Sequence, residues 1–70
     1  MADSVYKVVE LVGTSTTSWE EAAKSAVNAA GKSLRDLRIA EVSKLDLKVG
    51  EGGAIVFRAR VNLSFKVKAT

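Results

Sequence analysis

The side chains that most often carry out catalysis or bind transition metals are absent from this 70-residue sequence, which contains no histidine and no cysteine. A serine or threonine nucleophile needs an activating base, and no serine here has a plausible one nearby. Zinc is held mainly by histidine and cysteine, so a typical zinc site is excluded as well. The sequence therefore predicts a protein that is not an enzyme.

Carboxylates are the remaining candidates for metal chemistry, because oxygen ligands suit a hard cation such as calcium. Glu41, Asp46 and Glu51 supply such oxygens, but calcium prefers carboxylates that are clustered. The only obvious cluster is the pair Glu20 and Glu21, and it falls at the start of a predicted helix, where acidic side chains compensate the helix dipole. A metal site can therefore not be assigned to particular residues.

A glycine-rich segment at residues 50–53 reads Gly-Glu-Gly-Gly and could suggest a phosphate-binding loop. Such loops continue with a Lys-Ser or Lys-Thr pair and lead from a strand into a helix. This segment lacks the pair and joins two predicted strands. It therefore predicts a turn.

The charge of the chain favours a solvated surface over a nucleic-acid partner. Eleven basic and eight acidic side chains give a formal charge of +3, and the two signs are interspersed. No apolar run is long enough to span a membrane, and no signal-peptide pattern is present at the N-terminus. We therefore expect a cytoplasmic protein with neither nucleic acid nor membrane as a partner.

The elements that must position these residues follow the order strand, helix, strand, strand. Residues 5–12 are rich in β-branched side chains and predict a first strand that Gly13 ends. Ser18 and Glu21 form a capping-box pattern, which predicts a helix running to about Leu34. Apolar residues at three- and four-residue steps give the helix one apolar face, on which we expect Trp19 to lie in the core. That face consists of Trp19, Ala22, Ala23, Ala26, Val27, Ala30 and Leu34.

Residues 37–49 and 55–67 predict a long hairpin around the glycine-rich turn. The second strand alternates apolar and polar residues, as is typical of an antiparallel sheet with one buried face. At about 3.3 Å per residue it would span roughly 40 Å. A compact globule of 70 residues has a radius of gyration of only about 11 Å. We therefore expect this strand to curl around the helix, to reach into a neighbouring subunit, or to do both.

The first strand of the hairpin changes phase in its middle. Its apolar side chains occupy even positions before Ser43-Lys44 and odd positions after it, so one extra residue there, a β-bulge, would place all of them on one face. These side chains are Ala40, Val42, Leu45, Leu47 and Val49. The resulting register places Asp46 across from Arg58, which is a favourable cross-strand pair. Ile39 is then an apolar side chain among polar ones, and it either packs in a subunit contact or lines a ligand pocket.

Oligomerisation is the expected route to a stable fold. We expect a single domain over residues 1–70, and a chain of this length buries only a modest core. Small domains usually need disulfides, a metal or oligomerisation. Without cysteine, disulfides are excluded, and a homo-oligomer is the remaining solution.

The sequence resembles the dodecin family over residues 5–67. The resemblance lies in the opening strand VYKVVELVGTS, the helix SWEEAAKSAVNAAGKSLRDLR, the pair Glu41-Val42 and the final VNLSFKV. It implies an α+β subunit of β-α-β-β order, with a three-stranded antiparallel sheet wrapped around one helix. It also implies a homododecamer forming a hollow shell. Typical dodecins bind flavins such as riboflavin or FMN between subunits and store them without catalysis.

The positions that contact flavin in this family differ here. Flavin dodecins carry Trp-Phe-Glu-Val after the helix, with the tryptophan stacked on the flavin, whereas residues 39–42 read Ile-Ala-Glu-Val. Arg58 stands where a glutamine hydrogen-bonds the flavin ring, and Asp46 replaces a basic residue. The resemblance thus implies ligand-binding positions at Ile39, Glu41, Asp46 and Arg58, with a degenerate flavin site because an aliphatic side chain offers no stacking face.

Two functions follow as alternatives. The leading hypothesis is a non-catalytic oligomeric shell that binds, stores or buffers a small molecule or ion. Residues 17–20, Thr-Ser-Trp-Glu, resemble a dodecin-like branch of the calcium dodecin type, so calcium is one such ion by resemblance. The alternative is a flavin-storage dodecin with an unusual site for FMN or riboflavin.

Overall fold

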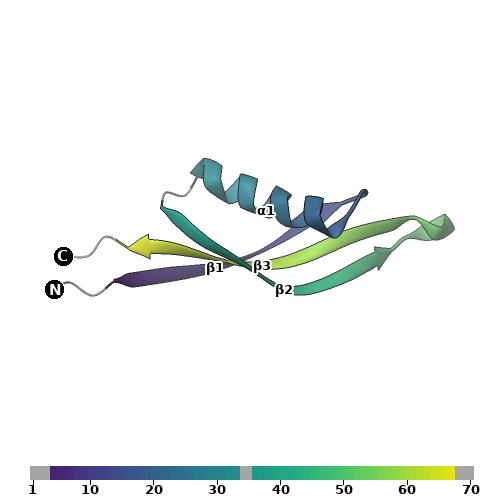
Figure 1. Ribbon diagram of the computed structural model, residues 1–70. Helices are drawn as coiled ribbons and strands as arrows, with labels where there is room; N and C mark the ends of the chain where they lie inside the picture. Colours follow the sequence, from purple (N-terminus) through teal and green to yellow (C-terminus); the bar gives the residue numbers. More distant parts are fainter. Residues whose placement is uncertain (1–3, 34–35, 68–70) are drawn as a thin grey trace.

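The computed structural model describes residues 4–33 and 36–67 and has the predicted β-α-β-β order (Figure 1). Three strands form one antiparallel sheet in the order β1-β3-β2. The elements are β1 (Val5–Ser15), α1 (Trp19–Ser33), β2 (Leu37–Val49), a short 3-10 turn η1 (Glu51–Gly53) and β3 (Ile55–Val67). The expected α+β class with a three-stranded antiparallel sheet is therefore confirmed.

The first strand is longer than the sequence predicts. Gly13 does not end β1, which continues to Ser15, and Gly13 pairs with Ala59 of β3. A Cβ atom at Gly13 would lie 1.9 Å from the carbonyl oxygen of Ala22 in α1. The glycine is needed because the helix backbone lies directly against the strand there, and not because the chain turns.

The start of α1 is capped by two serines. Ser18 Oγ accepts a hydrogen bond from the Glu21 N–H at 3.1 Å, as the capping box predicts. The capping box also predicts a bond from the Ser18 N–H to the Glu21 side chain, but the Ser18 N–H instead donates to Ser15 Oγ at 3.4 Å. The Thr17 N–H donates to the same oxygen at 2.9 Å. The end predicted at Leu34 lies outside the described residues.

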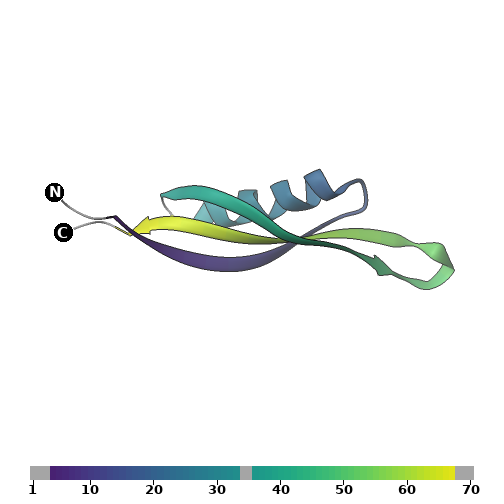
Figure 2. The same cartoon turned by 60° about the horizontal axis from the view of Figure 1, so that its bottom comes forward.

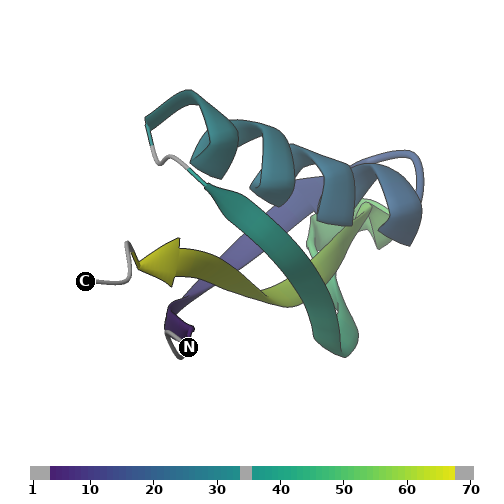
Figure 3. The same cartoon turned by 60° about the vertical axis from the view of Figure 1, so that its left-hand side comes forward.

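The core lies between α1 and the centre of β3. Three helix alanines one turn apart pack on the buried side chains of β3, and Val9 and Leu11 of β1 close the cluster from the side. The buried residues are Ala22, Ala26, Ala30, Ala59, Val61, Leu63 and Phe65. Small helix side chains bring the helix close to the sheet, which it crosses on one face (Figure 3).

The hairpin register agrees with the predicted one. Ser43 is the extra residue between the pairs Val42–Val61 and Lys44–Arg60, so the predicted bulge is confirmed. A second register shift between Leu37 and Ile39 has no counterpart in the sequence analysis. In the turn, Gly52 and Gly53 have φ values of 71° and 81°, a conformation that glycine adopts at little cost.

The molecule is elongated, with principal extents of 57 × 20 × 14 Å and a radius of gyration of 14.7 Å. The end of the β2–β3 hairpin extends past the first turn of α1, at the opposite end of the sheet from the start of β1 and the end of β3 (Figures 1 and 2). The hairpin therefore extends beyond the part of the sheet that α1 covers, and the expected reach of β3 into a neighbouring subunit stays a prediction. Among the described residues, no helix has the length and apolar content needed to cross a bilayer.

Candidate functional site

The four predicted ligand positions all lie on the sheet face that points away from α1. On β3 the odd-numbered side chains 59–65 are buried against the helix, so the even-numbered ones point outward. The cross-strand partners of these outward side chains are the predicted residues. The pairs are Ile39 with Ser64, Glu41 with Asn62, and Asp46 with Arg58.

One chain does not bring these positions into a single site. The partners of Ile39 and Asp46, Ser64 and Arg58, are six residues apart on β3, which corresponds to about 20 Å along the strand. Ile39 and Glu41 therefore form one group and Asp46 and Arg58 a second. A small ligand could contact both groups only through more than one copy of the chain.

Asp46 and Arg58 form a bidentate ion pair across β2 and β3. Arg58 Nε donates to Asp46 Oδ1 at 2.7 Å, and a terminal guanidinium nitrogen donates to Oδ2 at 3.0 Å. The fork of the guanidinium matches both carboxylate oxygens, so this geometry is well defined. The predicted cross-strand pair is thus present, and it occupies the Arg58 head group.

The ion pair shifts the pKa of each side chain in the direction that keeps it charged. The hydrogen bond from Arg58, opposed by partial desolvation and aided by the positive charges of Arg58, Arg60 and Lys44, holds the pKa of Asp46 below its usual value. The same bond raises the pKa of Arg58. Because the folded-state pKa of Asp46 is depressed, the pair favours the folded chain above the carboxyl's ordinary pKa and loses that effect as the pH falls through the folded-state value. Both side chains are partly solvated, which keeps the effect small.

Trp19 lies at the rim of the fold and not in the core. It is 36% exposed, and its indole Nε1 donates to the backbone oxygen of Asp46 at 3.1 Å. Its ring meets Phe57 edge-to-face, with centroids 5.2 Å apart and planes at 81°. The expected core position of Trp19 is therefore wrong. Trp19 is the first residue of α1, lies beyond the contact of the helix alanines with β3, and bonds to the backbone of the edge strand β2. Sequence periodicity contains no signal for this bond.

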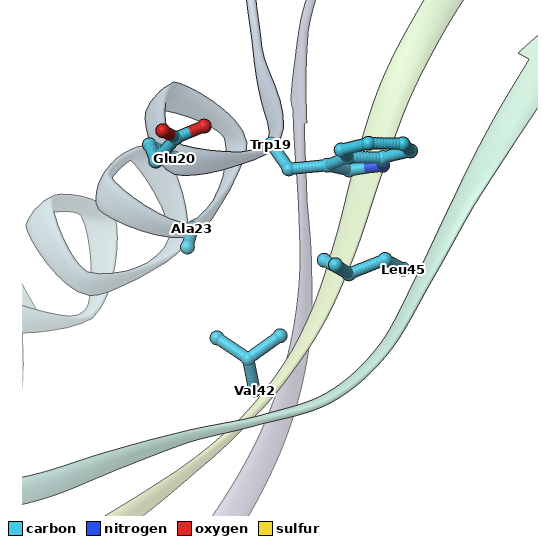
Figure 4. Close-up of a pocket in the computed structure, with 5 residues that line it drawn as sticks. All are labelled: Trp19, Glu20, Ala23, Val42 and Leu45. Carbon is cyan, nitrogen blue, oxygen red and sulfur yellow. The ribbon is translucent and has the colours of Figure 1, made fainter.

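A shallow apolar groove lies between the start of α1 and β2. It has a volume of about 350 Å³ and is lined by Trp19, Glu20, Ala23, Val42 and Leu45. Figure 4 shows Trp19, Val42 and Leu45 directed toward the space between helix and strand. None of these residues was predicted as a ligand position. The groove is on the opposite face of the sheet from the predicted ligand positions.

Neither ligand implied by the resemblance fits the side chains of one chain. In the described residues, no group of three or more acidic, histidine or cysteine side chains is placed to hold a metal ion. The described carboxylates of a single copy therefore do not form a calcium site of the clustered kind. For a flavin, Ile39 has no aromatic face, and Arg58 is held by Asp46.

Comparisons with known proteins agree on one family. The model of the Dodecin family matches residues 5–68. Calcium dodecin of Mycobacterium tuberculosis is 46% identical over 65 residues, covering 93% of this chain and 92% of that protein. Dodecin of Thermus thermophilus is 38% identical over 66 residues, covering 94% and 96%.

Solved structures resemble the fold closely. The crystal structure of the M. tuberculosis calcium dodecin, described as a calcium-chelating antigen with a novel calcium-binding site, superposes with a TM-score of 0.84. It is 45% identical in sequence, and the match covers 91% of each chain.

Proposed function

Because this chain belongs to the dodecin family, we propose that it is the subunit of a closed, non-catalytic shell of twelve identical chains that holds a small molecule or ion. We also propose that residues 1–70 form a single domain and that the shell is cytoplasmic. The observation that carries the proposal is the outward sheet face, on which all four positions that the resemblance assigns to a ligand lie together. Ile39 replaces the stacking aromatic residue, and Arg58 is engaged by Asp46.

The exposed area of the single chain supports assembly. The chain exposes 5293 Å², whereas a folded monomer of 7.4 kDa would expose only about 4,200 Å². The difference of roughly 1,100 Å² exceeds the ~800 Å² that each partner loses in a standard interface. The surplus includes many large apolar side chains on β1 and β2. A stable subunit therefore needs partners that cover this surface.

An ion is one candidate for the cargo. The Mycobacterium tuberculosis relative is named a calcium dodecin, and this chain is more similar to it than to the Thermus dodecin. Since one copy lacks a cluster of three ligands among its described residues, a calcium site in this protein would combine carboxylates of neighbouring copies. Glu41, which is exposed on the outward face, is one carboxylate available for that.

A flavin store is the second candidate. The pair Glu41-Val42 matches the Glu-Val that follows the aromatic residues in flavin dodecins, which favours a ligand position at the same place. Two features argue against a flavin store: Ile39 has no aromatic face, and Arg58 is engaged by Asp46. The two candidates therefore differ in what the purified protein should contain.

Native mass spectrometry of freshly purified protein tests the assembly and the cargo together. We expect a mass near twelve times 7.4 kDa, plus the mass of any bound ion or molecule. Added calcium should increase the mass, and a chelator should reverse the increase, if the cargo is calcium. A folded monomer at micromolar concentration would contradict the proposed shell.

Riboflavin binding should be weak or absent. An aromatic stack contributes about 0.5–1.5 kcal/mol beyond area burial, and loss of ring burial adds to this at about 25 cal/mol per Å². Together they should weaken binding by roughly a hundredfold or more relative to a flavin dodecin. The purified protein should be colourless and should quench riboflavin fluorescence little.

A variant combining Ile39→Trp, Asp46→Arg and Arg58→Gln is the matched gain-of-function control for the riboflavin test. It should quench riboflavin fluorescence more strongly than the unmodified protein. Asp46→Arg is included because Arg58→Gln alone would leave the carboxylate without its partner. Submicromolar riboflavin binding by the unmodified chain would favour the flavin store instead.

A further inference from the structure

One side chain of α1 contacts both strands at the place where Asp46 and Arg58 pair. The Trp19 Nε1 donates to the backbone oxygen of Asp46 at 3.1 Å. The Trp19 ring lies edge-to-face against Phe57, which directly precedes Arg58 on β3. Figure 4 shows the indole extending from the start of α1 toward the strands. Among the described residues, the bond to Asp46 is the one hydrogen bond that joins α1 to β2.

The edge strand β2 has little else to keep Asp46 in place. It pairs with β3 on one side only, and residues 38–49 are all exposed. The guanidinium of Arg58 matches both carboxylate oxygens only while the Asp46 backbone stays at a fixed distance from β3. Exposed segments with few buried contacts open at a low free energy. A bond that fixes the Asp46 carbonyl group therefore restrains the strand at the residue that holds Arg58.

Arg60 provides a comparison within the same sheet face. The Arg58 and Arg60 side chains are both 38% exposed. Arg60, however, has only a single contact to Glu10, with 3.9 Å between Nε and Oε1, which is too long for a hydrogen bond. Burial therefore does not explain the bidentate contact of Arg58. The difference points to the restrained position of Asp46.

We propose that Trp19 is a positioning residue for the ligand position at Arg58. By fixing the Asp46 backbone, Trp19 keeps the carboxylate on the guanidinium. Asp46 thereby engages two of the five N–H donors of Arg58 and balances its charge, so an anionic ligand must displace the carboxylate to bind there. Trp19 thus selects against anions at this position. The inference rests on the proposed function, because it concerns one of the proposed ligand positions.

Arginine modification by phenylglyoxal, located by peptide mass spectrometry, tests the inference in the variant Trp19→Phe. Phenylalanine keeps an aromatic ring beside Phe57 but has no N–H for the Asp46 oxygen. The measured quantity is the modification rate of Arg58 divided by that of Arg60 in the same sample. One hydrogen bond corresponds to about two- to tenfold in an equilibrium constant. We therefore expect this ratio to rise at least about twofold in Trp19→Phe.

Two further variants calibrate the arginine ratio. Asp46→Asn removes the charged partner of Arg58 directly and should raise the ratio at least as much as Trp19→Phe does. Val27→Ala weakens the packing of α1 on the core, eight residues and roughly 12 Å along the helix from Trp19. It should leave the ratio at the value of the unmodified protein. A general loss of stability is thereby separated from the loss of the indole bond.

The emission of Trp19 gives a second measurement, because this is the only tryptophan of the chain. If the indole and the ion pair are coupled, the coupling is reciprocal. Asp46→Asn and Arg58→Gln each break the pair and should shift the Trp19 emission maximum to longer wavelength. Arg60→Gln breaks only the looser contact and should leave the maximum unchanged.

The outcomes separate this inference from the proposed shell. An arginine ratio in Trp19→Phe equal to that of the unmodified protein or of Val27→Ala would overturn the inference. Unchanged emission in both Asp46→Asn and Arg58→Gln would overturn it too, and decides alone if Trp19→Phe fails to fold. A monomeric mass in light scattering would overturn the shell but not this inference, because Trp19 and the ion pair belong to one chain.

Discussion

Replacing Gly13 with alanine is expected to lower the free energy of unfolding by about 3 kcal/mol or more, at the upper end of overpacking effects. The added Cβ would lie 1.9 Å from the Ala22 carbonyl oxygen and 3.1 Å from the Ala26 Cβ. Backbone cannot rotate away as a flexible side chain can, so α1 must move off β1. That movement also disrupts the packing of Ala22, Ala26 and Ala30 on β3. Urea unfolding followed by far-UV circular dichroism measures the change.

Gly31→Ala is the matched control. A Cβ at Gly31 meets nothing within 4 Å, and the residue lies inside α1. Alanine there should stabilise the protein by roughly 0.5–1 kcal/mol, because glycine is a poor helix former. Both variants must be compared at one protein concentration, since assembly couples stability to concentration. Equal stability of the two variants would show that α1 does not approach Gly13 as closely as the structure indicates.

Deleting Ser43 should abolish assembly and lower the thermal midpoint by roughly 10 °C or more. Ser43 is the extra residue of the bulge, and the turn keeps residues 44–49 in register with β3. The deletion therefore turns residues 37–42 over, so that Val42 leaves the groove and Glu41 faces the helix side. Displacing Val42 alone costs about 1.5–3 kcal/mol when partners in the assembly cover its side chain. Each kcal/mol shifts the midpoint of a small domain by about 4–8 °C.

Ser43→Ala separates the bulge from the serine side chain. It removes only the exposed hydrogen bond from Ser43 Oγ to the Arg60 carbonyl oxygen at 3.3 Å, so a loss of about 0.5 kcal/mol is expected. Light scattering and thermal unfolding of both variants give the comparison. A deletion variant that keeps its assembly and its thermal midpoint would contradict the role given to the bulge.

The hairpin and its bulge are predictable because a strand has a period of two. Each apolar residue of β3 fixes the face of its neighbours, and the phase change at Ser43 can be seen in the order of residues alone. The register predicted from that pattern places Asp46 across from Arg58, and the structure has this pair as a bidentate contact. Local periodicity is sufficient here because strand partners follow from a single turn.

The candidate site shows where this kind of prediction ends. The four ligand positions do lie on one face, as alternation requires. Their separation along the sheet, about 20 Å from Ile39 to Asp46, follows from strand geometry and means that one chain cannot complete the site. The family resemblance predicts these ligand positions, whereas any convergence of them on one ligand depends on how copies of the chain meet.

Residue order determined the elements, their faces and the hairpin register of this protein, because these follow from contacts between neighbours in sequence. Only the tertiary structure decided the role of Gly13, the bond from Trp19 to Asp46 and the exposure of the apolar side chains at the end of β2. Each of these depends on the distance between segments that are far apart in the chain. The approach of α1 to β1 and the length of hairpin left beyond the helix set those distances, and no periodicity within one segment contains them.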